Sequence, residues 1–116
     1  MNINNGRTTL RRYTFGDLFG MFSVDHIGEE VPEYIDIISG NHPLPPITLI
    51  QQKGGNYQLI GSYSINLLHT AFQGYIKNNI AYHRRRIAGY VIEAIIIEPS
   101  SYQEDVVSTY KKAGLL

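Results

Sequence analysis

Residues 56–76, NYQLIGSYSINLLHTAFQGYI, restrict the possible folds more than any other stretch of the chain. They join a short β-prone run to a Gly-Ser turn and then to an amphipathic helical pattern that begins at Ser64. The preceding residues 47–51 have the composition of a strand, and residues 53–56 supply a Gly-Gly turn. We therefore expect a β-hairpin followed directly by a helix.

Two further helices are predicted before the hairpin. Thr14 and Asp17 match a capping box, in which each side chain accepts a hydrogen bond from the other residue's backbone N–H. Residues 30–39 predict the second helix, because Pro32 suits a first turn and apolar residues recur on one face. Residues 1–8 are polar and are expected to form a flexible arm.

The second half of the chain adds a strongly β-prone run. Residues 90–97, YVIEAIII, predict a mostly buried central strand, and residues 80–86 are expected to be extended. Ser101 and Glu104 form another capping box and predict a last helix. Together these elements predict an α+β fold, with a small mixed or antiparallel sheet and three to four helices, in a single domain over residues 1–116.

Composition restricts the chemistry. The chain contains no cysteine, so disulfides and cysteine-based zinc or redox chemistry are excluded. Its four histidines are isolated in sequence and no carboxylate pair stands out, so we expect neither a metal nor a cofactor. The net charge is zero, which does not favour a broad electrostatic attraction to nucleic acid. No signal peptide or membrane-spanning pattern is found, which predicts a soluble, cytoplasmic protein.

The turn after the hairpin is the first candidate site. Its residues lie where a strand meets a helix N-terminus, and free backbone N–H groups at such a position can bind a phosphate. The residues of this candidate site are Gly61, Ser62, Tyr63, Ser64 and Asn66. The same pattern also fits a tight turn in which Ser62 or Ser64 caps the helix. No lysine or glycine-rich phosphate loop accompanies it.

A basic segment is the second candidate site. Its residues are Tyr82, His83, Arg84, Arg85 and Arg86. Arginine binds phosphate groups and tyrosine stacks on bases, so this segment is a hypothetical nucleic-acid contact. The alternative is an exposed sheet edge or turn that charge keeps soluble.

Residues 30–76 resemble the ParB/sulfiredoxin-like fold, and most closely the N-terminal region of the DUF262 family of modification-dependent restriction systems. That family joins a helix to a G-x-P-I/L-P-P-I strand, then to a strand ending in I-D-G-Q-Q-R, and then to a helix. In this chain GNHPLPPI at 40–47 and NYQLI at 56–60 match the framework. The resemblance implies a ParB/sulfiredoxin-like arrangement of the sheet and helices.

The match fails at the functional motif of the DUF262 family. The family's Asp falls on Gly61, its Gly on Ser62, its two Gln on Tyr63 and Ser64, and its Arg on Ile65. The phosphate-binding guanidinium is therefore replaced by an apolar side chain, and the acid is lost. This degenerate resemblance implies a non-catalytic binding protein of viral or mobile-element type, which contacts a host protein or a nucleic acid in the host cytoplasm.

A second resemblance implies an enzyme instead. IGSYSINLLHTAFQG is similar to the I-G-H-D-S-T-I-N-L-V-N-T-L-x-G motif of viral ring nucleases, which cleave cyclic oligoadenylate and act as anti-CRISPR proteins. With one residue deleted, the matching residues are Gly61, Ser64, Ile65, Asn66 and Leu67. The family's catalytic histidine falls on Ser62, and its N-terminal strand is not predicted here. The alternative function is thus a nucleotide-directed nuclease or phosphohydrolase that uses residues 61–66.

Self-association is left open by the sequence. The strands at 47–60 or 90–97 could pair across a dimer axis, and the nine tyrosines suit an interaction surface. A homodimer is therefore one of the expected partners, beside a host protein and a nucleic acid.

Overall fold

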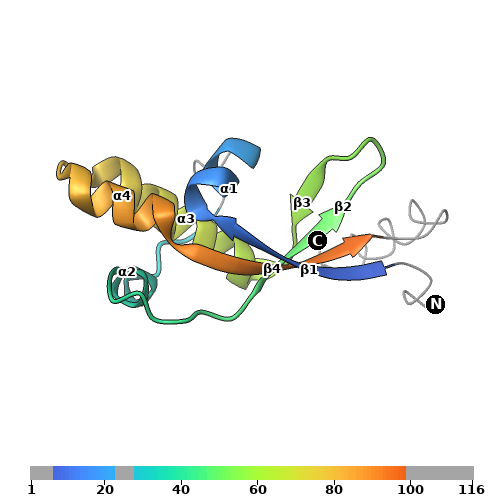
Figure 1. Cartoon of the computed structure of the whole chain (residues 1–116), viewed down its shortest axis with the longest axis horizontal. Coiled ribbons are helices and arrows are strands. Elements are labelled where there is room, and N and C mark those ends of the chain that lie inside the picture. The colour runs from blue at the N-terminus through green and yellow to red at the C-terminus, as the bar shows by residue number, and fades with distance from the viewer. Residues whose placement is uncertain (1–6, 23–27, 99–116) are drawn as a thin grey trace.

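The computed structural model describes residues 7–22 and 28–98, which form a four-stranded mixed sheet and four helices (Figure 1). The elements in chain order are β1 (Arg7–Thr14), α1 (Phe15–Met21), α2 (Pro32–Ser39), β2 (Ile47–Gln51), β3 (Tyr57–Leu59), α3 (Gly61–Lys77), α4 (Ala81–Gly89) and β4 (Val91–Glu98). The predicted α+β class is confirmed. The helix predicted at Ser101 and Glu104 lies outside the described residues.

The strands lie in the order β1-β4-β2-β3. β4 runs antiparallel to β1 and parallel to β2, and β2 and β3 form the antiparallel hairpin. The prediction that residues 90–97 form a central strand is therefore confirmed. β4 is paired with β1 along its length and with β2 over residues 94–97, so these four residues offer no free edge to a second copy of the chain.

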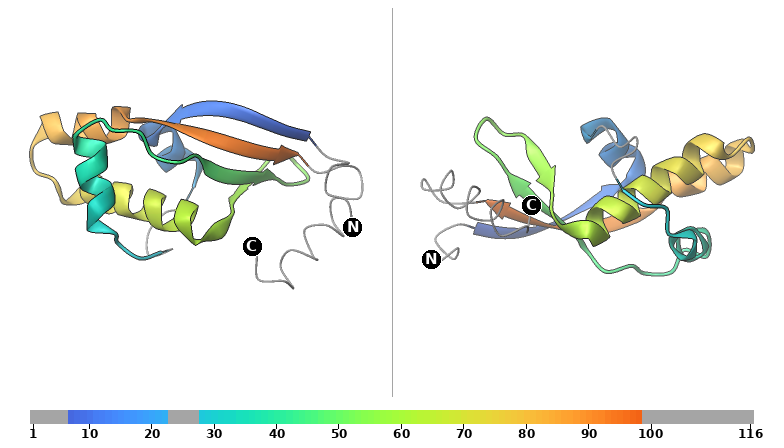
Figure 2. Two further views of the ribbon diagram at one scale, coloured as in Figure 1. Left: turned by 90° about the horizontal axis from the view of Figure 1, so that it is seen from below. Right: turned by 180° about the vertical axis from the view of Figure 1, so that it is seen from behind.

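One face of the sheet is covered by α3, which runs beneath it in Figure 2. Ile92, Ala94 and Ile96 of β4 belong to the same buried core as Leu67 and Leu68 of α3. The intervening β4 side chains are only partly buried or exposed, because successive side chains of a strand point to opposite faces. β4 is thus buried mainly on one face. None of the described helices has the length and apolar composition needed to cross a membrane.

The predicted hairpin is confirmed, and its Gly54 and Gly55 have φ values of +95° and +88°. The helix that follows begins at Gly61 rather than at Ser64. Gly61 has a φ of +84°, a conformation that glycine adopts without steric penalty, so the chain turns here and enters α3 at once. The expected serine cap is wrong, because neither Ser62 nor any other side chain caps α3.

Local capping chemistry correctly predicts α1. The Thr14 hydroxyl accepts a hydrogen bond from the backbone N–H of Asp17 at 3.1 Å, and the Asp17 carboxylate accepts one from the N–H of Thr14 at 3.3 Å. Pro32 starts α2 as expected. Both helices therefore begin where their first-turn residues indicate.

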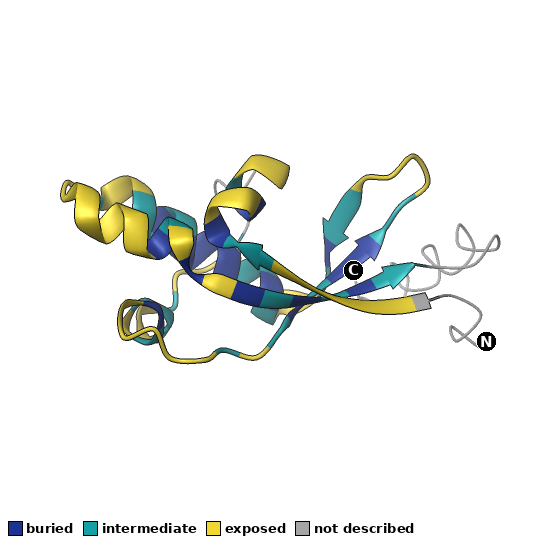
Figure 3. Cartoon of the chain, in the orientation of Figure 1, coloured by how far each residue is buried: buried dark blue, intermediate teal, exposed yellow. Residues whose placement is uncertain are grey.

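The strand β1 is not predicted by the sequence. Residues 7 and 8 were expected in a flexible arm, but they belong to this strand, and residues 1–6 lie outside the described part of the chain. Residues 8–12 are exposed (Figure 3), so the alternation of apolar and polar residues that marks a half-buried strand is missing. The chain therefore has an N-terminal strand, although none was predicted. The lack of such a strand can no longer be used as an argument against the resemblance to the ring nucleases.

The prediction that residues 80–86 are extended is wrong, because residues 81–89 form the helix α4. Alanine and arginine favour helix, but Ile87 is the one buried apolar side chain of α4. A helix with so little apolar surface lacks the periodic pattern on which the prediction depended.

Candidate functional site

The two candidate sites lie at opposite ends of α3 (Figure 1). Gly61 begins this helix and Lys77 ends it, so the helix has 17 residues. At a rise of 1.5 Å per residue the helix is about 25 Å long. The basic helix α4 starts shortly after the C-terminal end of α3, so the turn at 61–66 and the basic segment form separate sites.

Two polar side chains of the turn are hydrogen-bonded to distant backbone. The Ser64 side chain is 2% exposed, and its Oγ accepts a hydrogen bond from the backbone N–H of Thr48 at 2.9 Å. Asn66 Oδ1 accepts one from the N–H of Glu29, also at 2.9 Å. These bonds attach α3 to β2 and to the segment before α2, so both groups have structural roles.

Tyr63 has a structural role as well. Its hydroxyl donates a hydrogen bond to the carbonyl oxygen of Pro45 at 2.6 Å, and its ring packs edge-on against Tyr34 with centroids 5.9 Å apart. Burial, with smaller contributions from Tyr34 and Tyr90, raises the pKa of Tyr63 to about 12. Tyr63 is therefore neutral at physiological pH and holds the proline-rich connector between α2 and β2 against α3.

Ser62 is the one remaining polar side chain of the predicted turn, and it is exposed. Gly61, where the DUF262 family has its acid, is exposed and has no side chain. Within residues 7–22 and 28–98 no cluster of three or more histidine, aspartate or glutamate side chains could hold a metal ion. His69, the histidine of α3, is buried within the fold. The turn thus presents one hydroxyl and the first N–H groups of α3.

Substitution of Ser64 by alanine tests the structural role of this hydroxyl. We expect Ser64→Ala to lower the free energy of unfolding by about 1–3 kcal/mol, because the N–H of Thr48 loses its acceptor. The exposed Ser62→Ala should change it by less than about 0.5 kcal/mol. Urea denaturation measures both values, and equal effects of the two substitutions would contradict this assignment.

The basic segment forms most of α4 and is fully at the surface (Figure 3). Successive residues of a helix are about 100° apart, so the arginines at 84, 85 and 86 point in three different directions around α4. Arg84 and Arg85 are both exposed. Among the described residues neither of them pairs with a carboxylate, whereas Lys77 pairs with Glu30 at 2.6 Å.

Arg86 makes tertiary contacts that its two neighbours lack. Its guanidinium donates one hydrogen bond to the carbonyl oxygen of Ser39 at 2.9 Å and another to the Tyr82 hydroxyl at 3.0 Å. It also lies 5.8 Å from the centroid of the Tyr82 ring. Arg86 thereby satisfies a carbonyl group at the C-terminal end of α2, and neither of its two acceptors carries a negative charge that would offset the guanidinium.

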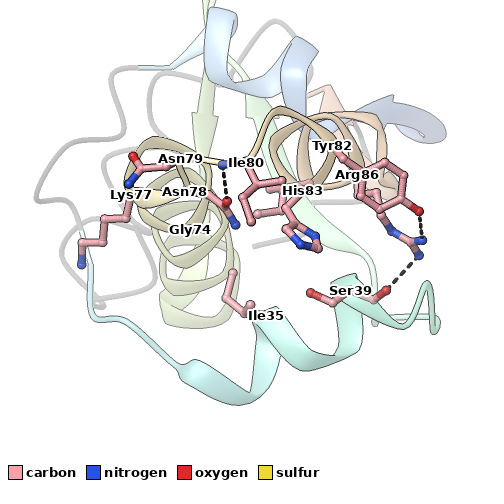
Figure 4. Close-up of a pocket in the computed structure, with 11 residues that line it drawn as sticks. Ile35, Ser39, Gly74, Lys77, Asn78, Asn79, Ile80, Tyr82, His83 and Arg86 are labelled. Atoms are coloured by element: carbon pink, nitrogen blue, oxygen red, sulfur yellow. Dashed lines mark hydrogen bonds between the residues drawn. The ribbon is translucent and has the colours of Figure 1, made fainter.

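An open groove of about 710 Å³ lies beside α4 (Figure 4). It is bounded by Ile35 and Ser39 of α2, by the C-terminal end of α3, by the connector at 78–80, and by Tyr82, His83 and Arg86 of α4. The structure therefore brings three residues of the predicted basic site into one concave surface. The connector and the α2 residues were not predicted, because only the tertiary fold places them beside α4.

Lys77 contributes less positive charge to this groove than the sequence indicates. Its Nζ lies 2.6 Å from Glu30, and this hydrogen bond lowers the pKa of the Glu30 carboxyl below its usual value. The pair neutralises Lys77 locally. The net positive charge of the groove lining therefore comes from Arg86 of α4.

No protein-family model, curated protein or solved structure matches this chain. The resemblances to the DUF262 family and to the viral ring nucleases stay predictions. The function is therefore inferred from the geometry and charge of the described residues.

Proposed function

We propose that this protein is a non-catalytic nucleic-acid-binding protein and that α4 is its contact surface. The decisive observation is that α4 exposes both Arg84 and Arg85 to solvent, without a carboxylate partner among the described residues. The helix itself contains no acidic residue. A phosphate backbone is the ligand that such a surface attracts most strongly.

A local cluster can act in this way although the net charge of the chain is zero. Salt screens exposed charges beyond about 10 Å at moderate ionic strength, so a phosphate group at α4 responds mainly to the nearby arginines. Guanidinium groups also bind phosphate oxygens through paired N–H donors. With so few contacts we expect a modest affinity and a moderate decrease with salt.

The structural roles of the 61–66 side chains favour binding over catalysis. Ser64 and Asn66 accept hydrogen bonds from the backbone, and the Tyr63 hydroxyl is bonded to Pro45. A nuclease or phosphohydrolase needs a nucleophile, a base or a metal aimed at its substrate. These three side chains serve the fold instead, which supports a degenerate scaffold.

A scaffold of this kind suits a viral or mobile-element protein that binds a molecule of its host. Such a protein keeps the framework of a ParB/DUF262-like domain without its reactive groups. Nucleic acid is the favoured host partner because arginines dominate the exposed surface of α4. A host protein partner is the other outcome of the experiment below.

Fluorescence anisotropy with labelled oligonucleotides of about 20 nucleotides tests the proposal. If two or three phosphates are neutralised, affinity for single strands should decrease about tenfold between roughly 50 and 200 mM salt. Cyclic oligoadenylate incubated with the protein should stay intact. Absence of binding at low salt would overturn the proposal, and capture of a host protein would then identify the partner class. Cleavage of cyclic oligoadenylate would support the ring-nuclease alternative instead.

A further inference from the structure

We infer that the groove beside α4 binds one unpaired nucleotide, with its base inside the groove and its phosphate near Arg86. This inference depends on the proposed function and specifies a ligand for the groove on the same helix. The volume of about 710 Å³ lies within the range of small-molecule sites. The occupant would be a nucleotide of a single strand or a free nucleotide, since both present the same base and phosphate.

The floor of the groove is apolar and close-packed. Gly74 of α3 allows this packing, because a Cβ atom built on it would lie 2.6 Å from Cδ1 of Ile35 and 3.5 Å from Cδ1 of Ile87. Ile80 also lines the groove and is 56% exposed, so part of its apolar surface is open to a ligand. A flat base could cover this apolar surface and remove it from water.

The groove is also lined by side chains that can form hydrogen bonds. Asn78 Oδ1 accepts a hydrogen bond from the backbone N–H of Ile80 at 3.0 Å, which fixes the side chain and leaves its amide donors without a described partner. Asn79 is exposed beside it, and His83 points into the gap between α4 and α2 (Figure 4). Amide and imidazole groups match the donors and acceptors of an unpaired base.

The wall on the α4 side contains an aromatic ring that is held in place. Tyr82 is 53% exposed, and Arg86 bridges its hydroxyl to the carbonyl oxygen of Ser39. Arg86 also brings a positive charge to the groove that no carboxylate among the described lining residues offsets. An exposed ring fixed in this way is a stacking platform, and the adjacent guanidinium favours the attached phosphate.

A nucleotide can enter this groove only when its base is not paired. In a duplex each base is stacked and its edge faces its partner, so the double strand would contact α4 through phosphates alone. We therefore expect the protein to bind single strands more tightly than a duplex of the same sequence. Arg84 and Arg85 would contribute to both modes, whereas Tyr82 would contribute to one.

Tyr82→Ala tests the inference in an anisotropy experiment that compares a single strand with its duplex. Affinity for the single strand should fall about tenfold, and affinity for the duplex should stay within about twofold. Tyr82→Phe keeps the ring and should retain most of the single-strand affinity. The exposed Leu10→Ala on β1 is the control variant and should change neither value. Because Tyr82 is exposed, these substitutions leave the core intact.

A photo-crosslinking experiment locates the base. An oligonucleotide that contains 4-thiouridine should crosslink to residues 78–86. An excess of free nucleoside monophosphate should reduce this crosslink only if the groove also accepts free nucleotides. The inference would be overturned if the protein bound single strand and duplex with equal affinity and Tyr82→Ala changed neither affinity. The proposed function would then stay intact. Absence of binding to either form would instead overturn the proposed function.

Discussion

Reversal of charge at Arg84 and Arg85 is expected to abolish nucleic-acid binding. In the double variant Arg84→Glu/Arg85→Glu we expect affinity for single-stranded DNA or RNA to fall by at least about 100-fold, because two phosphate contacts become repulsive. The salt dependence that remains should flatten. Anisotropy titrations at low salt measure this loss, and circular dichroism should show an unchanged helix content, since glutamate is also a good helix former.

A matched control distinguishes the effect of charges on α4 from the effect of the net charge of the protein. Arg11→Glu/Lys53→Glu changes the net charge by the same amount, but these residues lie on β1 and in the β2–β3 hairpin. We expect this control to lower affinity by less than about threefold, because screening limits the effect of distant charges. If both double variants lose binding equally, the interaction depends on net charge and α4 is not the contact surface.

The elements that the sequence predicts correctly are those that local chemistry determines. Thr14 and Asp17 start α1, Pro32 starts α2, and Gly54 with Gly55 closes the hairpin, and in each case the deciding residues are close in sequence. β1 is different, because its stability depends on pairing with β4. Its first pair joins residues 7 and 98, which lie at opposite ends of the described chain. No local pattern indicates such a partner.

The basic site on α4 could be predicted from the sequence only in part, because its residues are local but its groove depends on contacts between distant segments. The residues at 82–86 were identified from their types alone, since arginine and tyrosine suit nucleic acid wherever they lie. The sequence does not indicate that Arg86 lines a groove while Arg84 and Arg85 do not. This difference depends on the contact of Arg86 with Ser39, which lies far from it in sequence. The turn at 61–66 was favoured because a strand and a helix meet there. The hydroxyl of Ser64 in this turn accepts a hydrogen bond from the backbone N–H of Thr48, a contact that only the packed structure shows.

Replacement of Phe15 by alanine is expected to cause the largest loss of stability among these substitutions. The Phe15 side chain is completely buried and stacks between Phe19 and Tyr90, with ring centroids 6.1 and 5.3 Å away. Its backbone N–H also donates a hydrogen bond to the carbonyl oxygen of Tyr90 at 3.1 Å. We expect Phe15→Ala to lower the free energy of unfolding by about 3–5 kcal/mol, because the remaining cavity lies between packed rings.

A loss of this size would be a large part of the total stability of a domain, which is typically about 5–15 kcal/mol. Urea denaturation followed by circular dichroism measures it, and Met21→Ala on the exposed side of the same helix should cost less than about 1 kcal/mol. Because α1 packs against α4 through Gly16 and Ala88, the Phe15 variant should also bind nucleic acid only under conditions where it stays folded. If Phe15→Ala were as stable as Met21→Ala, α1 would not be part of the core, and the N-terminal elements could not support α4 in the way described.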